Sequence, residues 1–155
     1  MYTLTYIRHA EQINHREIDP YIKDNNVDVN FNYDYIICSP YQRCRQTVNA
    51  INKFNKFDRP VYIDIQISEF QSHSHFNDVM DPSSLVYGAI PMHESWFDFI
   101  RRVEKHFAYV STLRANILVV THGLVVKHLD EKITGVHKYK RGRDVPFVSG
   151  FTITV

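Results

Sequence analysis

Charged and polar side chains stand directly behind the apolar runs of this sequence that are predicted as strands. Arg8 and His9 follow the run at residues 3–7, and His122 follows the run NILVVT at residues 116–121. An imidazole can act as a nucleophile, and a guanidinium group binds phosphate oxygens through paired hydrogen bonds. These residue types together point to chemistry on a phosphate group.

Two more groups occupy corresponding places behind other predicted strands. Arg43 follows the run at residues 33–38, and Glu69 follows the run at residues 61–67. In an open α/β sheet, ligands bind beyond the carboxyl ends of the strands. We therefore expect all five side chains to meet at one edge of a sheet.

The five side chains suit phosphoryl transfer through a covalent histidine. His9 attacks phosphorus as a neutral imidazole, and the nearby arginines lower its pKa because they disfavour a second positive charge. Arg8 and Arg43 bind phosphate oxygens and offset charge in the transition state. Glu69 protonates the leaving alkoxide as a general acid, and His122 donates a hydrogen bond to the phosphoryl group.

The strands that must hold these groups are predicted from apolar and alternating runs. They lie at residues 3–7, 33–38, 61–67 and 116–121, and a last strand is predicted at residues 147–155. Helical patterns fill the intervals between them. The alternation predicts one domain over residues 1–155, an α/β three-layer sandwich with a mostly parallel central sheet and helices on both faces.

Local signals mark where the helices begin. Ser39 and Pro40 predict the first helix, with Ser39 as N-cap, Pro40 at the first helical position and free N–H groups directed at the phosphate. Ser95 and Asp98 have the spacing of a capping box and predict a second long helix. A short third helix is predicted after Gly123.

The motifs resemble, in the same order, those of the histidine phosphatase superfamily, the phosphoglycerate mutase-like enzymes. RHAEQ is similar to the family segment RHGE, and SPYQRCRQT is similar to SPLxRAxQT. ISEF, MHESWFDFIRR, VVTHG and VSGFTITV resemble four later segments of the family. The resemblance spans residues 3–155 and implies that the catalytic residues are His9, Arg8, Arg43, Glu69 and His122.

The resemblance implies a phosphatase that forms a transient phosphohistidine on His9 and needs neither a cofactor nor a metal ion. Its substrate would be a phosphomonoester, on a small molecule or on a phosphoprotein. The family asparagine six residues after the nucleophile is replaced by His15, and Asn14 lies one position earlier. Asn14 and Gly123 are the residues assigned to substrate binding.

Departures from the family pattern bear on the fold and on the reaction. Residues 16–33 lack the stretch LTxxGxxQA, so we expect one flank of the sheet to be trimmed or covered by a partner. The long insertions of the mutases are absent, which favours a phosphatase over phosphoglycerate mutase-type transfer. A phosphate-binding module without turnover is a further alternative, and the five filled chemical positions argue against it.

Two other chemistries fit the sequence less well. A cysteine phosphatase needs C-x5-R, but Arg45 comes one residue too late after Cys38, so Cys38 and Cys44 are predicted to be core residues. HSHFND at residues 73–78 has the spacing of metal ligands, but no second ligand cluster supports it. The basic stretch at residues 127–143 is interpreted as a solvated face, with a dock for an acidic ligand or a phosphorylated protein as the alternative.

The composition favours a globular protein without nucleic-acid or membrane partners. The 155 residues carry a net charge of +1, with 44% hydrophobic and 23% charged residues. No apolar run approaches the length of a membrane span, and the first residues do not resemble a signal peptide. The two cysteines do not form a disulfide framework, so we expect a cytoplasmic location with reduced thiols.

Overall fold

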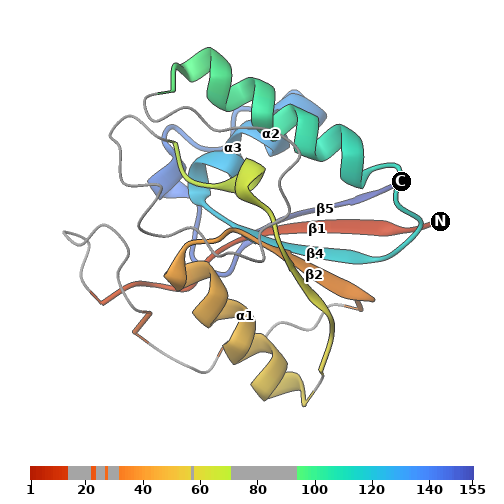
Figure 1. Ribbon diagram of the computed structural model, residues 1–155. Coiled ribbons are helices and arrows are strands. Elements are labelled where there is room, and N and C mark those ends of the chain that lie inside the picture. Colours follow the sequence, from red (N-terminus) through yellow and green to blue (C-terminus); the bar gives the residue numbers. More distant parts are fainter. Residues whose placement is uncertain (14–21, 24–26, 28–31, 57, 71–93) are drawn as a thin grey trace.

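The computed structural model describes residues 1–13, 22, 23, 27, 32–56, 58–70 and 94–155. Within these residues, five strands form one sheet in the order β3-β2-β4-β1-β5 (Figure 1). Strands β1 to β4 pair in parallel, and β5 pairs antiparallel with β1. The strands are β1 (Thr3–Arg8), β2 (Tyr35–Cys38), β3 (Val61–Ile63), β4 (Ile117–Thr121) and β5 (Gly150–Thr154).

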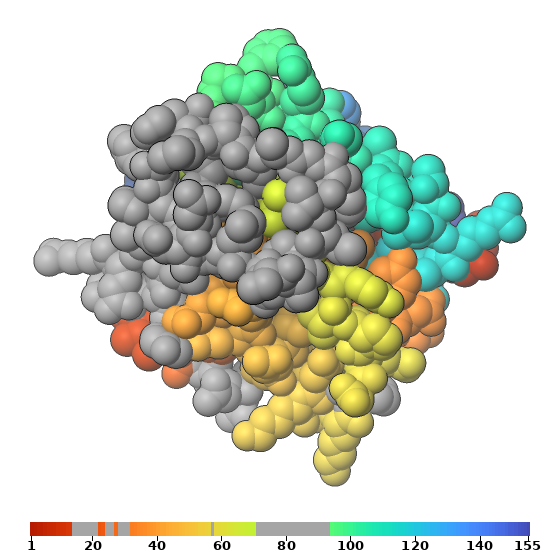
Figure 2. All heavy atoms as spheres, in the orientation of Figure 1, coloured from red at the N-terminus to blue at the C-terminus, as the bar shows by residue number. Residues whose placement is uncertain are grey.

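Helices cover both faces of this sheet, as the alternation of elements predicts. Helix α1 (Gln42–Asn55) packs on one face, and α2 (Trp96–Val110) and α3 (Gly123–Thr134) pack on the other (Figure 1). In the space-filling view, α2 and α1 occupy opposite margins of the molecule (Figure 2). The three-layer α/β prediction is therefore confirmed.

The central strands are apolar because both of their faces are buried. All five residues of β4 are buried. Its side chains alternate between the layers: Leu118 and Val120 face the core under α1, whereas Ile117 and Val119 face the core under α2 and α3. Parallel strands covered on both sides read as continuous hydrophobic runs, which is why this segment is such a clear strand signal.

The first turn of α2 has the predicted capping box. The Ser95 hydroxyl accepts a hydrogen bond from the Asp98 amide, and the Asp98 carboxylate accepts one from the Ser95 amide. No described helix is long and apolar enough to cross a membrane.

The predicted start of the first helix is wrong by two residues. Helix α1 begins at Gln42, its N-cap is Tyr41, and no side chain caps it. The Ser39 hydroxyl is instead 2.8 Å from Nε2 of His122. The Tyr41 amide also donates to this hydroxyl at 3.5 Å, so Ser39 combines a long local hydrogen bond with a shorter long-range one.

The strand predicted at residues 61–67 is also shorter than its alternating pattern indicates. Strand β3 ends at Ile63, and a 3-10 helix, η1 (Ile65–Ile67), follows it. The Asp64 carboxylate accepts a hydrogen bond from the Gln66 amide at 2.8 Å. This local side-chain contact turns the backbone out of the sheet and starts the path toward Glu69.

Candidate active site

The carboxyl ends of the parallel strands bring distant segments together at one edge of the sheet. Arg8 pairs with Thr121 as the last residue of β1. The His9 amide donates to Thr121, and the Ser39 amide donates to Val120, at 2.9 and 3.0 Å. The residues that follow β1, β2 and β4 are therefore neighbours, as the predicted topology requires.

His9 is buried, and its two ring nitrogens have different partners. Nδ1 lies 2.8 Å from the Ala10 carbonyl oxygen, and Nε2 accepts a hydrogen bond from Nε of Arg43 at 3.1 Å. A carbonyl oxygen only accepts and a guanidinium only donates, so Nδ1 carries the hydrogen and Nε2 carries the lone pair. These contacts select the neutral form that is nucleophilic at Nε2.

The turn after His9 is tied to helix α1. The Ala10 amide donates to the Thr47 hydroxyl at 2.9 Å, and that hydroxyl donates to the Arg43 carbonyl at 2.7 Å. Thr47 thus couples the backbone that orients His9 to the helix turn that carries Arg43. The threonine lies in the segment SPYQRCRQT, but sequence analysis did not assign it this role.

Arg43 lies between the two histidines. Its Nη2 is 3.1 Å from Nδ1 of His122 and 3.7 Å from Oε2 of Glu69. The centroids of the two imidazole rings are 5.5 Å apart. The guanidinium also lies over the Tyr41 ring, 4.6 Å from its centroid. The arginine is therefore held where it can bind a phosphoryl group attached to His9.

His122 is the N-cap residue of α3 and is completely buried. Its Nε2 contacts the Ser39 hydroxyl, and its Nδ1 is 3.5 Å from Oε2 of Glu69. Burial holds the pKa of His122 well below its usual value, and the charge of Arg43 acts in the same direction. The imidazole is consequently neutral at neutral pH.

Glu69 reaches the site from the segment after η1. Its Oε2 approaches both Arg43 and His122, and about a third of its side chain is exposed. Its Oε1 accepts a hydrogen bond from the Phe70 amide at 3.3 Å. A carboxyl group in this place is open to solvent and adjacent to both cationic and imidazole groups.

Arg102 of α2 organises the segment that carries Glu69. It donates to the carbonyl oxygens of Gln66, Ser68 and Glu69 at 2.6 to 2.9 Å. Its Nε and Nη2 bind the Glu94 carboxylate at 2.8 and 2.6 Å, in a buried bidentate pair. Arg102 and Glu94 fall in the segment MHESWFDFIRR, but neither residue was predicted to take part in the site.

Arg8 lies at the rim of the site rather than between the histidines. Its Nη1 donates to the carbonyl oxygens of Val145 and Arg143 at 2.6 and 3.1 Å. The guanidinium stacks on the Phe147 ring at 4.0 Å. Arg8 also lines a cavity of about 300 Å³ together with Glu69 and Gly123. Arg8 is therefore placed at the rim of the site, on the side of Glu69.

Both helices that start at this edge add favourable charge. Helix α1 begins just before Arg43 and α3 begins just after His122. The unpaired N–H groups and the dipole at a helix N-terminus attract anions. A helix N-terminus therefore lies at this edge of the sheet, although the helix begins at Gln42 rather than at Pro40.

The cysteines, the possible metal ligands and Asn14 are the remaining residues for which the sequence predicts a role. Cys38 and Cys44 are buried and belong to the hydrophobic core under α1, so their prediction as core residues is confirmed. Among the described residues, no cluster of histidine, cysteine and carboxylate groups could hold a metal ion. Asn14 and the HSHFND segment at residues 73–78 lie outside the described part of the chain.

A known protein family matches most of this chain. A model of the histidine phosphatase superfamily (branch 1) matches residues 26–144, which include Arg43, Glu69 and His122 and begin after His9. The chain therefore belongs to the histidine phosphatase superfamily. A search of curated proteins found no match.

Solved structures with the same fold include phosphatases and a phosphoglycerate mutase. The phosphoglycerate mutase from Bacillus anthracis str. Sterne aligns with a TM-score of 0.68 and 18% identity over 97% of this chain and 86% of its own. The ecdysone phosphate phosphatase from Bombix mori, solved with tungstate, aligns with a TM-score of 0.60 and 14% identity over 96% of this chain and 87% of its own. The alpha-ribazole phosphatase from Shigella flexneri aligns with a TM-score of 0.58 and 22% identity over 86% of this chain and 80% of its own.

Proposed function

We propose that this protein is a metal-independent phosphatase that hydrolyses a phosphomonoester through a phosphohistidine on His9. The observation that carries the proposal is the pair of contacts to the His9 ring. The Ala10 carbonyl holds the hydrogen on Nδ1, and the Arg43 guanidinium points to the lone pair on Nε2. The nitrogen that would attack phosphorus, Nε2 of His9, therefore lies directly beside the guanidinium group that would bind the phosphate oxygens.

In the first step, Nε2 of His9 attacks phosphorus and the bond from phosphorus to the ester oxygen breaks. Arg43 binds the phosphoryl oxygens, and Arg8 adds positive charge from the rim. Both guanidinium groups offset the negative charge of the transition state. The Glu69 carboxyl gives its proton to the departing ester oxygen, which leaves as an alcohol.

In the second step, water attacks phosphorus and the phosphorus–nitrogen bond breaks. The Glu69 carboxylate takes the proton from the water, and the electron pair of the broken bond returns to Nε2 of His9. Inorganic phosphate leaves and the protein regains its starting protonation. The same carboxyl group serves both steps because the alcohol and the attacking water occupy the same side of phosphorus.

His122 stabilises the phosphoryl group in this mechanism with the help of Ser39. A hydroxyl group can donate or accept a hydrogen bond. Ser39 can therefore pair with Nε2 of His122 whether the imidazole hydrogen is on Nε2 or on Nδ1. When phosphate oxygens take the hydrogen bonds of Arg43, Nδ1 of His122 can carry the hydrogen and donate it to the phosphoryl group. Ser39 is a positioning residue for this exchange.

The test is to trap the intermediate by quenching the protein during turnover of a labelled phosphomonoester. We expect an acid-labile, alkali-stable label on the peptide that contains Arg8 and His9, because phosphoramidates hydrolyse in acid. The label should be absent in His9→Ala and present in His137→Ala, a control at a histidine whose side chain is 86% exposed.

The outcome separates the proposal from its alternatives. Label on a peptide with Cys38 or Cys44 would overturn the histidine mechanism. A labelled intermediate that passes phosphate to an alcohol instead of water would indicate mutase-type transfer. Absence of both label and turnover across a broad phosphomonoester panel would leave a phosphate-binding module.

A further inference from the structure

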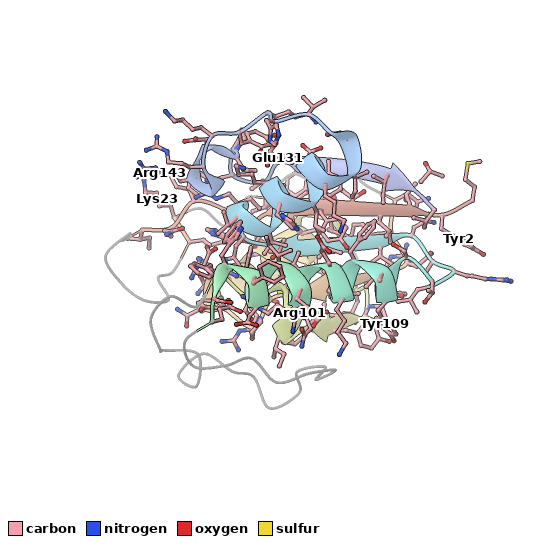
Figure 3. The ribbon with its side chains drawn as sticks, turned by 90° about the horizontal axis from the view of Figure 1, so that it is seen from above. Tyr2, Lys23, Arg101, Tyr109, Glu131 and Arg143 are labelled. Carbon is pink, nitrogen blue, oxygen red and sulfur yellow. The ribbon has the colours of Figure 1, made fainter. Side chains whose placement is uncertain are left out.

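The cavity beside Glu69 is lined by three arginines, and the reaction above uses only one of them. Its lining includes Arg8, Glu69, Gly123, Arg141, Gly142 and Arg143. Arg143 lies at the end of the molecule opposite Tyr2, which precedes β1, so it lies at the carboxyl end of the sheet (Figure 3). Arg141 and Arg143 belong to the basic stretch at residues 127–143, for which a solvated face and a dock for an acidic ligand are the two interpretations from sequence.

The backbone of this basic segment is fixed against the active site. A Cβ on Gly123 would lie 2.1 Å from the Gly142 carbonyl oxygen, and one on Gly142 would lie 2.7 Å from the Leu124 amide nitrogen. Arg8 also holds the Arg143 carbonyl at 3.1 Å. Two close glycine contacts and this hydrogen bond keep the 3-10 helix η3 (Gly142–Asp144) next to the start of α3.

The position of Glu69 determines which part of a substrate enters the cavity. As general acid, Glu69 contacts the oxygen that joins phosphorus to the alcohol. Glu69 also lines the cavity, so the alcohol part of the substrate extends into it. A volume of about 300 Å³ accommodates a small molecule.

The charge of the cavity favours an anion. Three guanidinium groups and one carboxylate line it, and Asp144 offsets part of the charge of Arg141, with Oδ1 at 3.6 Å from Nη2. The side chains of Arg141 and Arg143 are exposed and can reach a bound group. Arginine binds carboxylate and phosphate groups in the same bidentate manner.

We propose that Arg141 and Arg143 bind a second anionic group of the substrate. This inference rests on the proposed function and specifies its substrate class. The substrate is a small phosphomonoester whose alcohol part carries a carboxylate or another phosphate. Arg8, which contacts both the rim of the active site and the backbone of Arg143, joins the two anion sites.

The experiment compares short straight-chain alkyl phosphates that end in methyl with phosphates of equal chain length that end in carboxylate or phosphate. All have primary alkoxide leaving groups, so kcat/KM differences report recognition of the far end. We expect an anionic end to raise kcat/KM by about tenfold, mainly through a lower KM. The carboxylate and phosphate arms identify which anion is preferred.

Variants show whether the two arginines cause this preference. In the double variant Arg141→Gln, Arg143→Gln, the ratio of kcat/KM for anionic over methyl-ended substrates should fall to about one. The control Arg101→Gln, Arg114→Gln removes the same charge from exposed positions on α2 and before β4, and should keep the ratio. Equal loss in both variants would indicate general electrostatic attraction and overturn the proposal.

A binding measurement separates this inference from the proposed function. Calorimetry compares 3-phosphonopropionate with propylphosphonate, which differ in the terminal carboxylate and cannot be hydrolysed. Tighter binding of the first, lost in the arginine variant, supports the anion site even without turnover. Turnover of p-nitrophenyl phosphate without any preference for anionic ends would overturn the inference and leave the phosphatase proposal standing.

Discussion

At the scale of single residues, a backbone carbonyl group holds the Nδ1 side of the proposed nucleophile. The Ala10 carbonyl contacts Nδ1 of His9, and this leaves Nε2 to Arg43. A carbonyl group cannot ionise, so the orientation of this ring does not depend on the protonation of a neighbouring carboxylate. Proton transfer in the mechanism is left to Glu69.

Replacing Glu69 by Gln tests its role as the proton donor. The amide keeps the size of the side chain but cannot supply a proton to the leaving alkoxide. We expect kcat for alkyl phosphates to fall by about 10²- to 10⁴-fold, and kcat for p-nitrophenyl phosphate to change much less, because nitrophenolate leaves without protonation. The measurement is steady-state kcat for both substrates.

Glu104→Gln is the matched control, because Glu104 pairs with Lys132 and His128 away from the catalytic cluster. It should leave both rates near their original values. Equal losses with the two substrates in Glu69→Gln would assign the proton to a different carboxyl group, such as Asp81, which lies outside the described residues.

At the scale of elements, helix α2 determines where Glu69, the proposed proton donor, lies. The segment from Gln66 to Glu69 leaves the sheet after β3, and its carbonyl oxygens are gathered by Arg102. The Glu94 carboxylate in turn holds the arginine in a bidentate pair. This arrangement makes α2 a support for the active site as well as a cover for the sheet.

Arg102→Lys tests this support while keeping the positive charge beside Glu94. An ammonium group lacks the planar fork that reaches both the carboxylate and the carbonyl oxygens. We expect kcat for alkyl phosphates to fall by about 10- to 100-fold through displacement of Glu69, with a smaller fall for p-nitrophenyl phosphate. Kinetics with both substrates and thermal unfolding are measured together.

Arg101→Lys, at the neighbouring exposed position of the same helix, is the control and should change neither rate. If Arg102→Lys lowers the melting temperature and slows both substrates to the same extent, Arg102 has a structural role only. A leaving-group-dependent loss is the signature of a positioning residue.

At the scale of the whole molecule, the candidate active site includes a neutral histidine in the core. His122 is completely buried at the start of α3, and burial and the charge of Arg43 both depress its pKa. The unfolded chain binds a proton at this residue below its ordinary pKa of about 6.5, whereas the folded chain does not. The contribution of His122 to stability is therefore present above that pH and lost as the pH falls.

Chemical denaturation between pH 8 and pH 5 measures this contribution. We expect the free energy of unfolding to fall with decreasing pH, by at most about 1.4 kcal/mol per unit from this one group. His122→Asn should show a shallower slope, whereas His137→Asn, at the exposed histidine, should parallel the original protein. Equal slopes in all three proteins would contradict the buried neutral state of His122.

The sequence by itself determined the features that depend on local pattern and on the geometry of parallel strands. Alternating apolar runs and helical spacing predicted the three layers, because each pattern matches a backbone period. The capping box at Ser95 is a contact within one turn, so its residues are close in sequence as well as in space. The residues directly after each predicted strand could be expected at one edge of the sheet, because the carboxyl ends of parallel strands lie at the same edge.

Tertiary structure alone decided which side chains contact one another at this edge. The hydrogen bonds between Ser39 and His122 and between Arg102 and Glu69 join residues far apart in the chain. The turn at Asp64 replaced an alternating strand pattern with a 3-10 helix. Such contacts depend on strand order and on distances of about 3 Å, which follow from the packing of the whole chain rather than from any local pattern.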